Sequence, residues 1–147
     1  MQKALRRVLF ASALVSLFVA LGVGSGYAQD MIEIDVAPNV INIADRDVMI
    51  TVHTNIPYTD VINEDNQIAD VQLIIIEGVL ELEINDWFSD DRGFFVAKFV
   101  LISKDARDVV NTGGFNEVWM EGFYADFSAF EGFQEIKIIE VGRKRKG

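Results

Sequence analysis

Three aspartates near the middle of the chain have a spacing that can gather carboxylates around one turn. They are Asp86, Asp90 and Asp91, in the stretch Asn85 to Gly93. Calcium takes about six to eight oxygen ligands from carboxylates and carbonyls in flexible loops. The sequence therefore predicts a candidate calcium site here. The alternative is a plain turn, because Asp and Asn favour turns through hydrogen bonds to their own backbone. A second acidic corner lies between Asp60 and Asp70.

Aromatic side chains are concentrated in the second half of the chain, and two of them are candidates for a ligand-binding surface. Exposed Trp87 or Trp119 would offer a platform for a sugar ring or for an apolar side chain of a partner. The alternative is that these aromatics fill the core of a sandwich. Phe127, Phe130 and Phe133 are spaced by three in a turn-rich stretch, which predicts that they pin a loop to the core.

The sequence offers little for catalysis. It has no Cys and one His, His53, which rules out a thiolate nucleophile, a Cys-based zinc site and the usual transition-metal ligand sets. No glycine-rich loop precedes a helix, which argues against nucleotide binding. With 23 acidic residues, some carboxylate pair would fit glycoside hydrolysis in any fold, so such a pair carries no information. We therefore predict that the protein is not an enzyme and needs no cofactor, with a bound calcium ion as the alternative.

The first 28 residues have the pattern of a secretory signal peptide. Lys3, Arg6 and Arg7 precede an apolar run from Val8 to Val23, and small residues then lead to a cleavage site before Gln29. The alternative, an uncleaved anchor, is disfavoured because a spanning helix needs about 20 apolar residues. The prediction is a secreted or periplasmic protein with no membrane insertion after cleavage, a folded domain over 29–142 and a basic tail over 143–147.

The charge of the chain limits its partners. The formal net charge is −10, and removal of the signal leaves 10 basic residues against 23 acidic ones, or −13. Four of those bases lie at 143–146, so the body from 29 to 142 carries −17. Such a surface repels nucleic acid and anionic lipid. Export without Cys suits a bacterial periplasm or cell exterior, or the archaeal equivalent.

Alternation of apolar and polar residues predicts an all-β fold. Seven or eight short runs with this period are separated by turn residues, which is typical of an antiparallel immunoglobulin-like two-sheet sandwich. A Greek-key barrel is the competing architecture. The clearest predicted hairpin pairs Leu80–Phe88 with Phe94–Ile102, and only Lys104–Val110 has a helical pattern.

Two sequence motifs lie near the ends of the predicted domain: Ile34-Asp35-Val36-Ala37-Pro38-Asn39, followed by Ile41-Asn42-Ile43, and the stretch from Glu121 to Val141. The first is similar to the Ile-Asp-Ile-x-Pro-Gly opening, and the second to the closing motif, of a secreted β-sandwich module found in exported bacterial and archaeal proteins. The resemblance implies a non-enzymatic extracellular module. The family's middle often carries an Asp-x-Asn-x-Asp-Gly calcium loop, whereas Asn85 to Gly93 lacks that spacing and contains Arg92.

Three functional hypotheses follow. The first is an exported, non-catalytic module that acts in protein interaction or as a structural component of the cell envelope or exterior. The alternative is an extracellular module that binds calcium, a glycan or both through the 86–93 loop. A small exported hydrolase that uses carboxylates is a third possibility, which a substrate screen tests.

Overall fold

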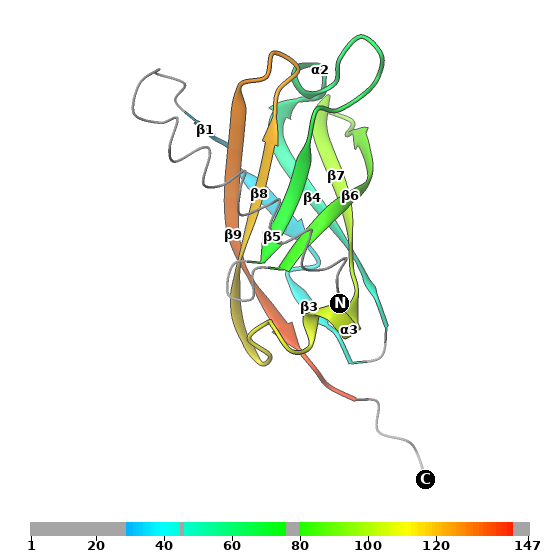
Figure 1. Ribbon diagram of the computed structural model, residues 1–147, viewed down its shortest axis with the longest axis vertical. Helices are drawn as coiled ribbons and strands as arrows, with labels where there is room; N and C mark the ends of the chain where they lie inside the picture. The colour runs from blue at the N-terminus through cyan, green and yellow to red at the C-terminus, as the bar shows by residue number, and fades with distance from the viewer. Residues whose placement is uncertain (1–28, 45, 76–79, 143–147) are drawn as a thin grey trace, which may run out of the picture.

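The computed structural model of the protein describes residues 29–44, 46–75 and 80–142. These residues confirm the prediction of a mostly β fold (Figure 1). The strands are β1 (Asp30–Met31), β2 (Ile34–Ala37), β3 (Val40–Asn42), β4 (Val48–Pro57), β5 (Val71–Ile75), β6 (Leu80–Ser89), β7 (Phe94–Leu101), β8 (Gly114–Phe123) and β9 (Ala129–Ile139). Two four-residue helices, α2 (Tyr58–Val61) and α3 (Ser103–Ala106), follow β4 and β7. The predicted signal peptide (1–28) and basic tail (143–147) lie outside the described residues.

The strands form one curled, hydrogen-bonded sheet. Its order is β1-β9-β8-β5-β6-β7-β4-β2, and β3 also pairs with β9. Residues 30–42, the opening segment, contribute strands at both edges of the sheet. At one edge β1 and β3 lie parallel to β9, and at the other β2 lies antiparallel to β4. The described residues contain nine strands rather than the seven or eight predicted, because this segment divides into three short strands as it changes partners.

Gly132 marks the place where the opening segment leaves β9 for β4. The Ile32 N–H donates to the Glu131 carbonyl (2.8 Å), and the Val36 N–H then donates to Oε1 of Gln134 (2.8 Å). A Cβ at Gly132 would lie 2.8 Å from the carbonyl oxygen of Ile32. Glycine is needed here because the two backbones cross too closely for any side chain.

The predicted hairpin forms over only part of its length. Residues Ile84 to Ser89 of β6 pair with β7, but Leu80 to Glu83 pair with β5 instead. A register irregularity between Ile84 and Asp86 lies at the point of change. Such irregularities bend a strand and let it leave its partner. The predicted helical segment 104–110 is represented by α3 alone, which begins at Ser103.

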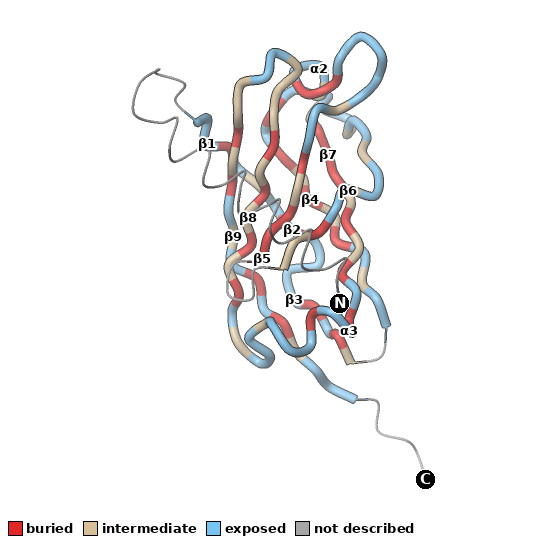
Figure 2. Tube along the Cα trace, viewed as in Figure 1, coloured by how far each residue is buried: buried red, intermediate tan, exposed pale blue. Residues whose placement is uncertain are grey.

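Burial alternates strictly along β8 and fixes which side chains face solvent. Asn116, Val118, Met120 and Gly122 are buried against the core, while the residues between them are partly exposed (Figure 2). The largest fully buried side chains of the core come from most of the longer strands. They are Phe95, Phe99, Phe130, Ile41, Ile43, Ile50, Leu73, Ile75, Leu101, Met120, Ile136 and Ile138. The outer side of β8 and β9 is therefore a separate surface, which faces away from this core.

Candidate functional site

The predicted calcium loop is a tight hairpin turn between β6 and β7. The Asp90 N–H donates to the Phe94 carbonyl (2.9 Å), and the Gly93 N–H donates to the Asp90 carbonyl (3.0 Å). Gly93 has a φ of +85°, the left-handed conformation that closes a three-residue hairpin loop. The turn is thus built from local residues and needs no ion to explain its shape.

The Asp90 carboxylate is already used within this turn. Its Oδ1 accepts the N–H groups of Arg92 (2.8 Å) and Phe94 (2.9 Å), and its Oδ2 lies 3.4 Å from the Arg92 guanidinium. The N–H of Phe94, followed by the contacts with Arg92, holds the pKa of Asp90 below its usual range. The side chain therefore acts as the cap of its own hairpin.

The other two predicted ligands do not converge with Asp90. Oδ1 of Asp86 accepts the N–H of Trp87 (2.9 Å), and both Asp86 and Asp91 are exposed. Within 29–44, 46–75 and 80–142, no group of three or more His, Asp or Glu side chains is arranged to hold a metal ion. Calcium binding at Asp86, Asp90 and Asp91 stays a prediction.

The two tryptophans lie in different parts of the sheet. Trp87 is half-buried on the part of β6 that pairs with β7, and it packs against the core. Trp119 lies on β8, between β5 and β9, with its side chain on the outer side. Of the phenylalanines spaced by three, only Phe130 is buried; Phe127 is 78% exposed and Phe133 is 50% exposed. The prediction that they pin a loop to the core is therefore wrong: Phe130 packs into the core but belongs to strand β9, as does Phe133, and Phe127 is exposed.

Trp119 is the centre of an outward-facing cluster that the sequence analysis did not assemble. It lies directly opposite Phe133 on β9, and the two rings stack with centroids 5.0 Å apart and planes 22° apart. Glu121 lies opposite Glu131 on one side of this pair, and Glu117 lies opposite Glu135 on the other. We call this surface the acidic–aromatic face; it consists of Glu117, Trp119, Glu121, Glu131, Phe133 and Glu135.

Ile74 supports the aromatic pair from the neighbouring strand. It lies opposite Trp119 in the pairing of β5 with β8, and only 7% of its surface is exposed. Ile74 is not part of the core cluster, because its side chain is on the outer side of the sheet. The aromatic pair is therefore part of an apolar row that crosses three strands.

The four glutamates of the face repel one another. Like charges directly opposite on antiparallel strands are destabilising. Among the described residues, none of the four side chains makes a hydrogen bond or an ion pair. Burial raises the pKa of Glu121, and the charges of Glu131 and Glu81 raise it further. The pKa of Glu81 is also raised, by burial and by the charge of Asp70. The face thus holds concentrated negative charge. Lys137, two residues beyond Glu135 on the same side of β9, lies at its edge, but within the described residues it makes no ion pair with any of the four glutamates.

The sequence carries a signal for this face that could have been found. The pattern Glu-x-aromatic-x-Glu occurs twice, at Glu117–Glu121 and at Glu131–Glu135. In a strand, residues i, i+2 and i+4 share one face, so each copy predicts a row of two carboxylates about an aromatic ring. Antiparallel pairing then brings like residues opposite one another. Of the six residues, Trp119 alone was predicted as a binding residue.

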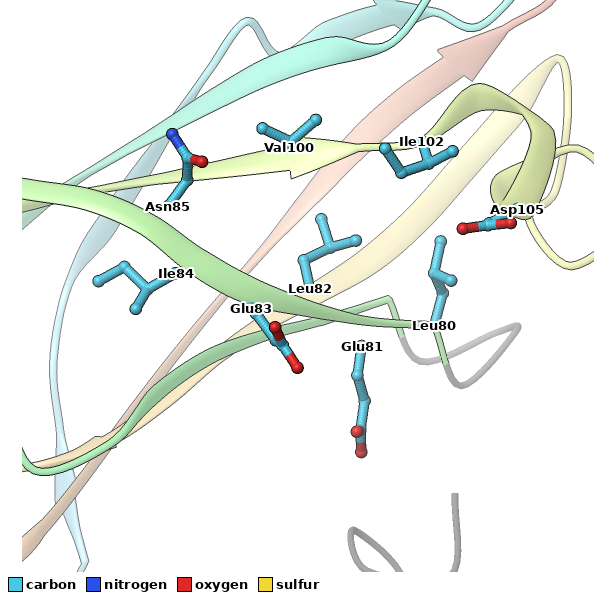
Figure 3. Close-up of a pocket in the computed structure, with 9 residues that line it drawn as sticks. All are labelled: Leu80, Glu81, Leu82, Glu83, Ile84, Asn85, Val100, Ile102 and Asp105. Atoms are coloured by element: carbon cyan, nitrogen blue, oxygen red, sulfur yellow. The ribbon is translucent and has the colours of Figure 1, made fainter. Parts of the chain in front are cut away.

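A shallow pocket of about 300 Å³ lies where β6 leaves β7 (Figure 3). Leu80, Leu82, Val100 and Ile102 contribute apolar side chains to its wall, while the carboxylates of Glu81 and Glu83 point to the opposite side of β6 (Figure 3). Asn85 and Asp105 also line the pocket, at its two ends. The pocket therefore combines apolar surface with one amide and one carboxylate, and this set indicates no particular reaction.

Comparison with known proteins identifies no family. No protein-family model matches the chain, and no curated protein matches it. Among solved structures, the chain is similar to AggA, the major subunit of aggregative adherence fimbriae type I from Escherichia coli. The two share 10% sequence identity over 75% of this chain and 94% of that chain, with a TM-score of 0.33. A search of the described helices finds none with the length and apolarity to cross a membrane.

Proposed function

We propose that the protein is an exported, non-catalytic interaction module that binds a cationic segment of a partner on its acidic–aromatic face. The observation that carries the proposal is the face itself: two opposed pairs of glutamates about a stacked Trp119–Phe133 pair. A protein selected for stability alone gains nothing from such pairs. Export is supported by the signal pattern of residues 1–28, and the resemblance of the opening phrase to secreted modules supports the same class.

The strand order supports an immunoglobulin-like sandwich as the scaffold. In that fold, strands A-B-E-D form one sheet and C-F-G the other. With residues 30–42 as strand A and β4 to β9 as B to G, the order β2-β4-β7-β6 corresponds to the first sheet and β5-β8-β9 to the second. On this assignment the acidic–aromatic face is the outer surface of the C-F-G sheet.

The chemistry of the face favours arginine and lysine. A guanidinium stacks on aromatic faces, and its fork of N–H donors matches carboxylates. Trp119 and Phe133 provide the ring surface, and Phe133 is half exposed. Carboxylates lie on both sides of the rings, so an extended basic segment can meet charge and ring surface together. An acidic or uncharged segment would leave the glutamates without counter-charges.

A binding experiment with an arginine-rich peptide tests the proposal. The chain contains two tryptophans, so the Trp87→Phe variant leaves Trp119 as the fluorescent reporter of the face. In this background, Glu121→Gln with Glu131→Gln should weaken binding about two- to thirty-fold, at roughly 0.2–1 kcal/mol for each exposed ion pair lost. The matched control is Glu64→Gln with Asp65→Asn. This control changes the net charge by the same amount as the face variant, but its two substitutions lie in an exposed turn away from the face.

Two results would refute the proposal. One is equal loss of affinity in the face variant and in the turn variant, which would indicate a long-range effect of net charge. The other is the absence of any Trp119 fluorescence change at peptide concentrations up to the millimolar range in low salt. Binding that weakens with added salt is expected, because exposed charge pairs are screened.

A further inference from the structure

The chain carries a segment with the chemistry that the acidic–aromatic face requires. Residues 143–146 read Arg-Lys-Arg-Lys, the densest run of bases in the sequence. Several bases of the described domain already have partners in their own neighbourhood. Arg92 pairs with Asp90 and lies over the Phe94 ring, and Arg107 pairs with Glu140 at 2.8 Å. The run at 143–146 is therefore the natural candidate for a cationic ligand.

The path of the chain after β9 is fixed up to Val141. Asn42 holds Val141 by two hydrogen bonds: its Nδ2 donates to the Val141 carbonyl (3.1 Å), and its Oδ1 accepts the Val141 N–H (3.2 Å). The ion pair of Glu140 with Arg107 anchors the residue before it. Val141 thus lies beyond the end of β9, two residues past Ile139, and the basic run follows it in the sequence after Gly142.

From that position the run cannot reach the Glu121–Glu131 pair of its own molecule. Strand residues advance about 3.4 Å each. If the chain reversed directly after Gly142, Lys146 would come back only to the level of Ile139. Glu131 is eight residues further along β9, or about 27 Å. Lysine and glutamate side chains together do not span that distance, so the run of the same molecule cannot pair with these two carboxylates, whereas the run of another molecule can.

We infer that the acidic–aromatic face binds the run Arg143-Lys144-Arg145-Lys146 of a second copy of the chain, an inference that rests on the proposed function. Charge complementarity carries it: the run has four bases and the face has four glutamates, none of which makes an ion pair within the described residues. In an extended segment, Arg143 and Arg145 lie on one side, about 7 Å apart, so one guanidinium can stack on the aromatic pair while the other meets carboxylates.

A charge-exchange experiment with the full chain, recovered after export from a gene that retains residues 1–28, tests this inference. One variant reverses the face, by Glu121→Lys with Glu131→Lys, and another reverses the tail, by Arg143→Glu with Arg145→Glu. Sedimentation velocity in low salt should show self-association of the wild type and at least about ten-fold weaker association of each variant alone. An equal mixture of the two variants should associate again, because each face then meets a tail of opposite charge. Arg46→Glu with Lys104→Glu changes the net charge by the same amount as the tail variant, is its matched control, and should behave as the wild type.

The outcomes separate this inference from the proposed function. A wild type that stays monomeric at millimolar concentration while the arginine-rich peptide binds would overturn the inference and leave the proposed function standing. Failure of both peptide binding and self-association would overturn both. Self-association that is unchanged in both reversed variants would overturn the inference, because it would require a different surface.

Discussion

Removing one glutamate from each opposed pair of the acidic–aromatic face is expected to stabilise the protein. The double variant Glu117→Gln with Glu121→Gln removes the repulsion in both pairs. A like-charged pair directly opposite on an antiparallel sheet costs about 0.2–1 kcal/mol, so the free energy of unfolding should rise by about 0.4–2 kcal/mol. For a domain of this size, that corresponds to a rise in Tm of about 2–10 °C.

Thermal unfolding followed by circular dichroism at pH 7 measures this difference. Glu64→Gln with Asp65→Asn is again the control of equal charge. Added salt should narrow the gap between the wild type and the face variant, since at about 0.5 M salt the screening length falls below roughly 5 Å. A face variant that melts at the same temperature as the turn variant, with the same response to salt, would refute the claim that the opposed glutamates repel.

The difference in unfolding free energy between the Glu121→Gln variant and the wild type should depend on pH in a defined direction. Burial and neighbouring charge raise the pKa of Glu121 in the folded protein, so the folded state holds this proton more tightly than the unfolded state. The charged carboxylate therefore destabilises the fold at neutral pH, and acidification through its raised pKa relieves this cost. The stability difference between Glu121→Gln and the wild type should be largest at pH 7 and close as the pH falls. If the stability difference between the two proteins grew as the pH fell, the raised pKa of Glu121 would be contradicted.

Three further predictions concern the scaffold. Asp90→Ala should lower the Tm because two backbone N–H groups lose their acceptor. Asp90→Asn keeps an oxygen at that place and should melt close to the wild type. Melting the wild type in EDTA and in millimolar calcium tests separately whether a calcium ion binds. Ile75→Asp should abolish cooperative unfolding, because it buries an unpaired charge at a fully buried position, while Ile75→Val should cost only about 0.5–1.5 kcal/mol. Gly132→Ala should destabilise the chain through a clash with the Ile32 carbonyl, whereas Gly142→Ala, with open space around it, should have no measurable effect on Tm.

Local patterns were sufficient for the strands and for the central turn. The alternation around β8 and β9 predicts which side chains face outward, because successive strand residues point to opposite faces. Asp90 to Gly93 forms its hairpin from neighbouring residues alone, with the φ of +85° that glycine adopts without strain. Sequence reasoning succeeds at such places because every interaction involved lies within a few residues.

The division of strands between partners was not predictable in the same way. The run Leu80–Phe88 has one continuous pattern, yet its first half pairs with β5 and its second half with β7. The opening segment likewise changes from β9 to β4 beside Gly132. These choices depend on the curl of the whole sheet, which brings segments far apart in sequence into contact.

By itself, the sequence determined a mostly β chain with a strongly acidic body, a compact turn at Asp90 and two copies of a Glu-x-aromatic-x-Glu pattern. Only the tertiary structure decided that these two copies lie opposite each other in register, with Trp119 on Phe133 and glutamate on glutamate. The physical reason is that a shift of one residue would turn the whole set to the other side of the sheet. Burial of Met120 and Phe130 in the core fixes that register, and with it the charge and ring surface that the face presents.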